Sequence, residues 1–521
     1  HSNAMAQELQ SKPSTDNERS HQKQAEYLSP MDIVVTARKR QESLRDVPVI
    51  ASVISNERLT QLQVTDIKDL PKLAPGLLIG TAVLSIGQQV SIRGVGTSSF
   101  DPGIDQSVSL NIDGMSLGQG LAYSSGLFDV GQVEVLKGPQ ALFFGKSSPG
   151  GVISLRTADP TDKFEVIANA GYEFDAHTRR GELVVSGPLT DTLKARLAGM
   201  LQKTDGFYYN PAVAAPGTGA KAPPYSRWGH GQSYQLRATV LWEPTSRFTA
   251  RLKGSLARDL TFNADNYQLV SCPDGVGAPF GYPFIAPEET CRKNRTARVV
   301  GMDTEVFPGL ARDGAPYVKI LQRYGTLELN YHPTDDITAT SVSSYYRLNS
   351  DSLLNASFSQ FAGPAVAVQN PRFRRTDFTQ ELRMSSDFDK PLNFTAGAFF
   401  QDGQVSNRVI INGNSLYGLP LTLSDGVNKI GIKTYSLYGQ LRWKIAPKVE
   451  LAAGARWADE TRKLDTTLFG DIVTLPTPRV HSSTLSPEVT LTYKPSEDLT
   501  AFAAEKEAFK SGPFRNATPG G

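Results

Sequence analysis

The sequence predicts an all-β membrane protein in which a long series of antiparallel strands follows a small α/β domain. Apolar and polar residues alternate over about ten residues at a time, as at 247–256 and 449–457, and this period of two suits a strand with one face in lipid. Short proline-containing turns alternate with long connections from residue 161 onward, which is typical of an outer-membrane barrel. No apolar run is long enough for a transmembrane helix.

The composition limits the possible functions. With 521 residues the chain is long enough for two or more domains, and its formal net charge of +2 argues against a nucleic-acid-binding protein held by a strong basic field. No spacing typical of a Ser/His/Asp triad, a catalytic carboxylate pair or a set of metal ligands stands out. We therefore predict no enzyme, no metal site and no cofactor.

The N-terminal segment contains one short strand. Residues 1–31 are expected to be a tag remnant and a disordered arm, because they are polar and lack hydrophobic periodicity. Residues 32–37 read DIVVTA, and a charged stretch, RKRQE, follows at 38–42. A strand on a flexible arm can add to the sheet edge of a partner protein, or it can pair inside its own domain. The residues alone favour neither, and too few precede the strand for another folded domain on that side.

Residues 44–160 are predicted to form one small α/β domain. Residues 48–54 are expected to be a strand, Ser55 the N-cap of a helix, and 65–70 a second helix ended by Pro71. Two further strands, at 90–94 and 109–114, lead into glycine turns.

The most specific part of this domain is residues 133–153, which read VEVLKGPQALFFGKSSPGGVI. We predict a strand, a Gly138–Pro139 turn, a helical turn that ends at Gly145, and a closing strand. A nucleotide-binding loop is the alternative, because Gly145 and Lys146 resemble the end of one. The spacing excludes it, since a P-loop has four residues between its first glycine and Gly-Lys, whereas six residues separate Gly138 from Gly145.

This stretch resembles the signature of the plug domain of TonB-dependent outer-membrane receptors, V-E-V-L-(R/K)-G-P-x-(A/S)-x-x-(Y/F)-G followed by a Gly-Gly pair. The segment around Pro75–Gly76, the I-R-G of 92–94 and the I-D-G of 112–114 match the plug in the same order. The turn glycines of these matches are Gly94, Gly114, Gly138, Gly145, Gly150 and Gly151. The segment before the domain resembles the family's TonB box, (D/E)-x-V-V-T-A.

The resemblance implies two sets of functional residues. The TonB box, which would add as a strand to the C-terminal domain of TonB, consists of Asp32, Ile33, Val34, Val35, Thr36 and Ala37, and a linker extends to residue 43. A plug latch consists of Arg93, Lys137 and the neighbouring Glu134, with the two cations bound to carboxylates on the barrel wall. Lys137 stands where the family often has Arg and lacks its forked geometry. The alternative is that either cation is a solvated surface charge.

Residues 161–521 are predicted to be the N-terminal part of a transmembrane β-barrel with about 13 strands. Short turns are expected at 187–192, 243–247, 332–336, 386–393, 446–448 and 494–498, and long connections at 205–230, 261–321, 350–372, 404–430 and 463–482. The resemblance implies a roughly 22-stranded antiparallel outer-membrane barrel with the plug in its lumen. An open sheet would leave two bare edges in lipid, so we expect the C-terminal strands to be missing from this sequence.

Several loop and wall residues are candidates for further roles. Cys272 and Cys291 lie in the longest loop, without partner histidines, and are expected to form a disulfide. Tyr208, Tyr209, Trp228 and Tyr267 are candidates for an outer ligand platform. The inward face of the strands carries a surplus of cations, Lys194, Arg196, Arg237, Arg247, Arg251, Lys253, Arg383, Arg442, Lys444 and Arg456. Such a surplus favours an anionic cargo, unless these charges hold the plug or solvate the wall.

The function implied by the resemblance is TonB-dependent uptake of a scarce ligand across the bacterial outer membrane. The expected ligand is a ferric siderophore or another anionic chelate, so that iron enters only as part of the cargo. The N-terminus would be periplasmic and the long loops extracellular; the expected partners are TonB, outer-membrane lipid with lipopolysaccharide, and the small-molecule ligand, with no nucleic acid. The alternatives are uptake of a non-iron nutrient such as an aromatic compound or a carbohydrate, a porin-like channel, which has no use for a plug, and a soluble β-rich enzyme.

Overall fold

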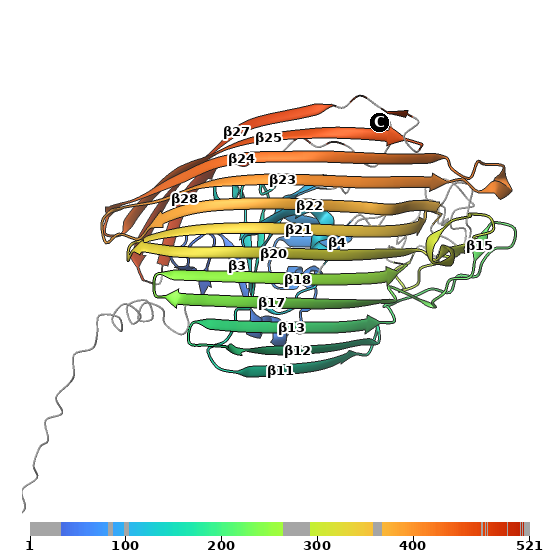
Figure 1. Ribbon diagram of the computed structural model, residues 1–521, viewed down its shortest axis with the longest axis horizontal. Helices are drawn as coiled ribbons and strands as arrows, with labels where there is room; N and C mark the ends of the chain where they lie inside the picture. The colour runs from blue at the N-terminus through green and yellow to red at the C-terminus, as the bar shows by residue number, and fades with distance from the viewer. Residues whose placement is uncertain are drawn as a thin grey trace, which may run out of the picture.

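The computed structural model describes residues 33–81, 87–97, 104–124, 126–263, 292–357, 367–469, 473–474, 476, 478–497, 499–510, 512 and 514. A curved antiparallel sheet forms one side of the molecule, and the N-terminal domain lies behind it, against its concave face (Figure 1). No helix in these ranges is long and apolar enough to span a bilayer.

The N-terminal domain is built on a five-stranded sheet in the order β3-β9-β10-β7-β8. Its strands are β3 (Ala51–Ser55), β7 (Asp105–Ile112), β8 (Met115–Gln119), β9 (Val130–Lys137) and β10 (Gly151–Thr157). The β10–β7 pair is parallel and the other pairs are antiparallel. A smaller sheet contains β4 (Leu77–Thr81), β5 (Gln88–Ile92) and β6 (Val95–Gly96), and the hairpin β1 (Val34–Val35) and β2 (Glu42–Ser43) precedes both sheets.

The helices of this domain are short: α2 (Asn56–Gln61), η1 (Ile67–Lys72), η3 (Gly120–Ser124) and α3 (Ala141–Phe144). Ser55 caps α2 as predicted, because its hydroxyl accepts a hydrogen bond from the amide of Arg58. The second helix is a 3-10 helix, and it continues through Pro71 to Lys72. The prediction that Pro71 ends it is wrong by one residue, since the φ of proline is compatible with a helix and only one donor is lost.

Thirteen strands form the large sheet as a continuous meander, which confirms the strand number expected from the sequence. They are β11 (Glu165–Glu173), β12 (Thr178–Pro188), β13 (Leu193–Thr204), β17 (Gly231–Thr245), β18 (Phe248–Phe262), β20 (Tyr317–Thr334), β21 (Ile337–Asn355), β22 (Ala367–Ser386), β23 (Leu392–Asn412), β24 (Ser424–Ala446), β25 (Val449–Leu468), β27 (Arg479–Ser496) and β28 (Leu499–Lys506). Strand β26 (Val473–Thr474) pairs beside β25. The sheet is not closed, because β11 and β28 each pair with one neighbour only among the described strands.

All six predicted short turns occur, but three predicted long connections are shorter than expected. Strands β21, β23 and β25 continue to Asn355, Asn412 and Leu468, well into the segments expected to be loops. Apolar alternation reports only the part of a hairpin that faces lipid, and these hairpins continue beyond it with polar residues on both faces. The long connections also contain the small pairs β14 (Tyr208–Tyr209) with β16 (Arg227–Trp228) and β15 (Ala220–Lys221) with β19 (Gly301–Met302), and the 3-10 turns η6 (Ala311–Gly314) and η7 (Ser415–Tyr417).

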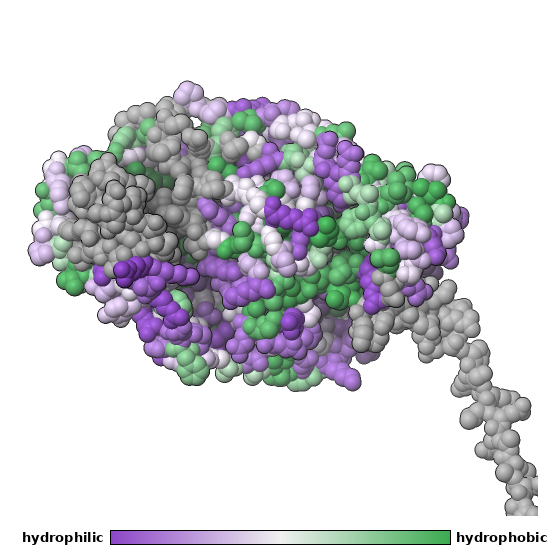
Figure 2. Space-filling model, turned by 180° about the vertical axis from the view of Figure 1, so that it is seen from behind, coloured by the Kyte–Doolittle hydropathy of each residue, from purple (hydrophilic) through white to green (hydrophobic). Residues whose placement is uncertain are grey.

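The two faces of the large sheet have opposite character. The outward residues are apolar and exposed, as with Leu252 at 53%, whereas the adjacent inward Lys253 is 2% exposed. This is the reverse of a soluble sandwich and fits a sheet with lipid outside and the N-terminal domain inside. On the side turned away from the viewer in Figure 1, hydrophobic and hydrophilic residues are mixed in small patches (Figure 2).

Candidate functional site

The segment that resembles a TonB box is folded against its own domain. β1 pairs with β2 in the register Val34 with Ser43 and Val35 with Glu42, and the side chain of Val35 is buried. Of the two possibilities that the sequence left open, the structure therefore contains the pairing of this strand within its own chain. Asp32, the first residue of the predicted box, lies outside the described residues.

Glu134 holds this hairpin to the N-terminal domain. Its carboxylate accepts hydrogen bonds from the amide of Thr36 at 3.0 and 3.1 Å and from the Thr36 hydroxyl at 3.0 Å. Gln132 donates both to the carbonyl oxygen of Val34 at 2.8 Å and to Glu134 at 3.0 Å. Burial raises the pKa of Glu134, although the bonds from Thr36 and Gln132 oppose that rise. Glu134, predicted as part of a latch to the barrel, instead binds the box.

Three consecutive cations tie the same hairpin to the large sheet. Arg38 binds Glu450 at the start of β25 at 3.2 Å, and Lys39 binds Glu381 on β22 at 3.1 Å. Arg40 binds Asp387, in the turn after β22, at 3.0 Å. Because all these partners except Glu381 lie at or next to short turns, the hairpin sits at the short-turn end of the sheet.

The deepest contact between the domain and the sheet is a network around Asp105, at the start of β7. Asp105 binds Arg375 of β22 at 3.1 Å and also binds Arg462 of β25. Arg375 is bound in addition by Asp377 at 2.6 Å, and Arg462 by Glu460 at 2.6 Å. Burial opposes the ionisation of Asp105, but Arg462 and Arg375 outweigh it and hold its pKa below the usual range.

Lys146, from the signature stretch, completes this network. It binds Glu460 of β25, and burial lowers the pKa of its amine while Glu460 partly offsets that effect. The lysine that superficially resembled the end of a phosphate loop is thus an anchor of the domain to the sheet. We name the group Asp105, Lys146, Arg375, Asp377, Glu460 and Arg462 the Asp105 network.

Most of the predicted inward cations also hold the domain. Lys253 binds Asp113 at 3.1 Å and the Thr157 carbonyl at 3.0 Å, and Arg196 binds Asp129 at 2.6 Å. Arg237 and Arg456 bind carbonyl oxygens of the domain, at Phe128 and Leu142. Arg442 pairs with Glu42 of the hairpin, and Arg251 and Lys194 pair with Asp159 and Asp162, where the domain leads into the sheet. Arg383 binds Glu381 on its own strand, and Arg247 binds Asp335 of a neighbouring turn. The cation surplus is therefore largely structural.

The latch role of Arg93 and Lys137 stays a prediction. Within the described ranges neither residue forms an ion pair with a carboxylate of the sheet. Arg93 is exposed, and burial together with the neighbouring Arg93 guanidinium lowers the pKa of Lys137. Other residues of the domain, Asp105 and Lys146 among them, make the attachment to the described strands. These residues were missed because their partners are hundreds of positions away in the sequence.

The six turn glycines shape the domain around these contacts. Positive φ angles occur at Gly94, Gly114, Gly138, Gly145 and Gly151. At Gly151, φ is +141° and an added Cβ would lie 2.2 Å from the carbonyl oxygen of Leu136, so a side chain cannot fit where β9 meets β10. A Cβ at Gly150 would lie 2.8 Å from the Val95 carbonyl oxygen.

The predicted outer aromatic platform does not form as expected. Trp228 is 3% exposed and donates its indole N–H to the Ala297 carbonyl at 2.8 Å. It packs with Val299 and Tyr208 inside the long connections, so the prediction that Trp228 is open to a ligand is wrong. Tyr209 is 56% exposed. Tyr267 and the predicted disulfide of Cys272 and Cys291 lie outside the described residues.

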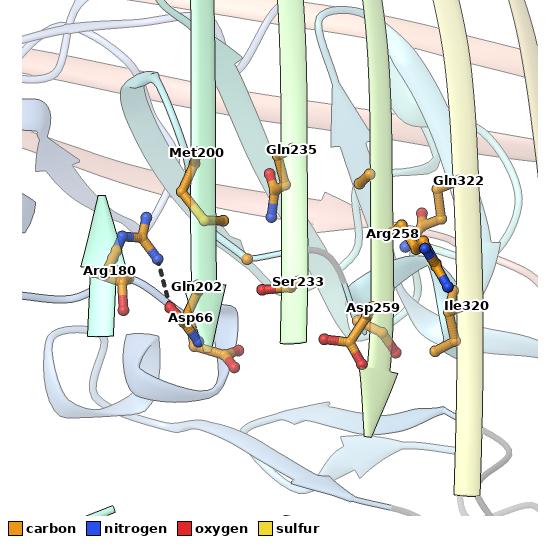
Figure 3. A pocket seen from close by; sticks show the side chains of 14 residues that line it. Asp66, Arg180, Met200, Gln202, Ser233, Gln235, Arg258, Asp259, Ile320 and Gln322 are labelled. Carbon is orange, nitrogen blue, oxygen red and sulfur yellow. Dashed lines mark hydrogen bonds between the residues drawn. The ribbon is translucent and has the colours of Figure 1, made fainter. Parts of the chain in front are cut away.

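A polar recess lies between the domain and the inner wall, at the end of the sheet that carries the long connections (Figure 3). Asp66 and Thr65 at the start of η1 face Arg180, Gln202, Ser233 and Gln235 on the first strands of the sheet. Arg258, Asp259 and Gln322 also line the recess. Arg180 donates to Gln202 at 3.1 Å. The recess offers hydrogen-bond donors and acceptors of both charges, with Met200 and Ile320 as its larger apolar side chains.

Two family models match the chain along most of its length. The model described as TonB-dependent Receptor Plug Domain matches residues 43–152, and the model described as TonB dependent receptor-like, beta-barrel matches residues 292–521. The chain belongs to the family of TonB-dependent receptors. Within the described residues no cluster of three His, Cys, Asp or Glu side chains is arranged to hold a metal ion.

Several relatives of this TonB-dependent receptor have curated descriptions. The pesticin receptor of Yersinia pestis is 24% identical over 434 residues, which cover 82% of this chain and 56% of the relative. The ferric enterobactin receptor PirA of Pseudomonas aeruginosa is 30% identical over 191 residues, 33% of this chain and 26% of the relative. The vitamin B12 transporter BtuB of Vibrio vulnificus is 30% identical over 183 residues, which cover 34% of this chain and 28% of the relative. The chain spans about half the length of the first of these relatives.

Solved structures have the same fold. The ferric yersiniabactin uptake receptor FyuA from Yersinia pestis superposes with a TM-score of 0.71 at 19% identity, over 90% of this chain and 66% of that one. The ferripyoverdine receptor of the outer membrane of Pseudomonas aeruginosa superposes with a TM-score of 0.66 at 13% identity, over 92% of this chain and 59% of that one.

Proposed function

We propose that this chain is the plug-bearing part of a receptor for TonB-dependent uptake of a ferric siderophore or a similar chelate across the outer membrane. The observation that carries the proposal is the hairpin of residues 34–43, in which Glu134 of the plug binds Thr36 and three cations bind the short-turn end of the sheet. A two-residue strand held by side-chain contacts can be released and offered to a partner. TonB would then add its own strand to residues 33–37 and pull on the plug.

The direction of transport follows from the position of the two ends. The hairpin lies at the short-turn end, which we assign to the periplasm because TonB acts there in this family. The polar recess and the long connections lie at the other end, which faces outside. A ligand that enters the recess contacts η1 and the inner wall together, and so bridges the plug and the barrel.

The nature of the cargo rests on the relatives. The inward cations support an anionic cargo only weakly, because most of them hold the plug. Receptors described for ferric enterobactin and ferric yersiniabactin favour an iron chelate. The likeness to a vitamin B12 transporter keeps a non-iron nutrient as the second candidate. Uptake of ⁵⁵Fe-labelled catecholate and phenolate chelates, compared with labelled corrinoids, separates the two.

The coupling step can be tested with a matched pair of variants. Val34→Pro removes the amide donor that strand addition needs, whereas Val34→Ala retains it. We expect Val34→Pro to abolish energy-dependent uptake and Val34→Ala to retain most of it, with equal amounts of both variants in the membrane. Unchanged uptake by Val34→Pro would contradict TonB coupling through this strand.

A further inference from the structure

A small cavity lies between the plug and the wall, beside the Asp105 network. The turn that follows α3 of the plug lines it together with strands β22 to β25 of the sheet. Its volume is about 30 Å³. Because one buried water needs roughly 10–15 Å³ of such space, the cavity has room for two waters or one small ion, and for no chelate. The cargo therefore does not enter it.

The lining of this cavity has more cations than carboxylates. Lys146, Arg375 and Arg456 line it, and Asp105 is the single carboxylate in the lining. Asp105 is bound by both Arg375 and Arg462, so it repels an anion less than a free carboxylate would. The Asp105 network is neutral as a group, because it joins three carboxylates to three cations. Arg456, which is 3% exposed, is therefore a cation in excess.

Arg456 forms no ion pair with a carboxylate of the described residues. Two other inward carboxylates of the wall are already in use. Glu381 is shared by two cations, and Glu488 on β27 is bound by Lys506 at 3.1 Å. A buried charge without a partner is strongly destabilising. The excess charge of Arg456 therefore calls for an anion.

The guanidinium of Arg456 is positioned by its neighbours but has donors to spare. It lies over the rings of Phe399 and Tyr438, with its Cζ atom 5.4 and 5.1 Å from the ring centroids. Its Nη1 donates to the carbonyl oxygen of Leu142 at 3.4 Å, whereas its buried Nε has no hydrogen-bond partner among the described residues. A Cβ at Gly145 would lie 3.1 Å from its Nη2, so the glycine lets the plug turn approach closely. A guanidinium has five N–H donors, and an acceptor in the cavity would satisfy those left over.

The plug supplies further donors on the other side of the cavity. Ser147 is 2% exposed, and its hydroxyl has no partner in the part of the chain that the structure describes. The amine of Lys146 has three N–H donors, and its partners are Glu460 and the Thr434 hydroxyl, the latter at 3.2 Å. Donors from the plug and from the wall thus meet at one small cavity.

We propose that this cavity binds one small inorganic anion of the size of chloride. The anion accepts hydrogen bonds from Arg456 of the wall and from Ser147 and Lys146 of the plug. It also balances the charge of Arg456, which a water molecule would not do. The anion thereby joins the plug to the wall next to the Asp105 network. The site depends neither on the identity of the cargo nor on coupling to TonB.

The first test uses the intact wild-type receptor, crystallised with sodium bromide in place of sodium chloride. A bromide ion in the cavity should give an anomalous scattering peak beside the Nε atom of Arg456 and the hydroxyl of Ser147. Water alone gives no such peak, and its presence there without bromide would overturn the proposal.

Amide exchange at residues 141–148 measures the binding in solution. Gluconate, which is too large for the cavity, replaces chloride so that the ionic strength stays constant. Above the dissociation constant, each tenfold rise in chloride should slow exchange by about tenfold, because the anion must leave before this turn opens. A bromide peak in the crystal without any chloride dependence in solution would mean an adventitious ion only, and would also overturn the proposal.

Variants locate the site. Arg456→Met removes the excess charge and should abolish the chloride dependence, and Ser147→Ala should weaken chloride binding by roughly tenfold. The control is Arg196→Met, which removes another buried arginine of the wall, one that is paired with Asp129 of the plug. The control should keep the chloride dependence even if its plug is less firmly attached. The same chloride dependence in Arg456→Met as in the wild type would contradict the proposal, and since no step measures uptake, its failure is distinct from failure of the proposed transport.

Discussion

The plug is attached at two places that differ in depth and strength. At the short-turn end, Thr36 is held by one carboxylate, Lys39 forms a buried pair with Glu381, and Arg40 reaches Asp387, whose side chain is 74% exposed. In the interior, the Asp105 network joins six charged groups, and five of them have side chains no more than 3% exposed. Breaking a buried pair costs about 3–5 kcal/mol, whereas losing one hydrogen-bonded carboxylate costs about 1–3 kcal/mol. A pull on the N-terminal segment should therefore release the hairpin before it disturbs the network.

The largest effect is expected for Asp105→Asn. Arg375 and Arg462 would remain buried with one charge too few, so the attachment of the plug should weaken by about 3–5 kcal/mol. Amide exchange in β10 should accelerate by roughly 100-fold or more, because each 1.4 kcal/mol corresponds to a factor of ten. Asp46→Asn is the control, because its pair with Lys494 is 54% and 39% exposed and contributes little. Equal exchange in the two variants would remove the distinction between the two attachments.

A smaller, local effect is expected for Glu134→Gln. The carboxamide introduced by this substitution has no charge and replaces the second acceptor oxygen with a donor NH₂ group, so the bonds from Thr36 weaken and the closed hairpin should lose about 1–3 kcal/mol. Exchange at the Thr36 amide should rise, the affinity for the C-terminal domain of TonB should rise by the same factor, and β10 should remain protected. If Thr36 exchanges at the wild-type rate, Glu134 is not what holds the box.

Lys39→Gln should have a smaller effect again. Its partner Glu381 retains Arg383 at 3.0 Å and the Tyr438 hydroxyl at 2.7 Å, so the carboxylate is not left alone. We expect a loss of about 1 kcal/mol, seen as faster exchange at residues 38–43. Arg40→Gln should be close to neutral, since its pair with Asp387 is exposed. A larger loss for Arg40 than for Lys39 would reverse this order.

The two attachments should also differ in pH dependence. Burial raises the pKa of Glu134 in the closed hairpin, and release into water returns it toward the ordinary value. Glu134 therefore binds a proton more tightly in the closed hairpin than in the released one. This difference favours the closed hairpin below the ordinary pKa of Glu, and the advantage is lost as pH rises through the raised pKa. After correction for intrinsic exchange rates, Thr36 should open more readily with rising pH, and Glu134→Gln should abolish the trend.

The Asp105 network has the opposite sign. The pKa of Asp105 is lowered in the folded state, so the contribution of its ionised carboxylate is present above the ordinary pKa of Asp and declines only as pH falls through the lowered pKa. Protection of β10 should consequently be constant from weakly acidic to neutral pH. A change in β10 that parallels the change at Thr36 would mean that the two attachments open together.

Local chemistry made much of the fold predictable. Alternation gave the strands of the sheet, proline-containing segments gave the six short turns, and Ser55 gave the start of α2. The signature at 133–153 gave the β9-turn-α3-β10 unit, because its glycines adopt backbone conformations that other residues avoid. The errors in three long connections arose where hairpins leave the lipid-facing region and no longer alternate.

The partners of the charged residues were not predictable in the same way. Alternation places Lys253 on the inward face, but it says nothing of what lies opposite, and the inward Arg375 and Arg462 were missed. Arg462 meets Asp105 across 357 positions, and Lys39 meets Glu381 across 342. No local pattern marked Asp105, because the strand that it begins, DQSVSLNI, alternates polar residues with apolar ones although all of it is buried.

The sequence by itself determined that the chain has a short N-terminal strand, a plug and a meander of lipid-facing strands, because each depends on spacing within a few residues. Only the tertiary structure decided that Glu134 binds the box, that Lys146 is an anchor, and that Trp228 is buried. These outcomes depend on how the sheet curves around the plug and on the register of the strands, which set the distance between residues that no local pattern relates.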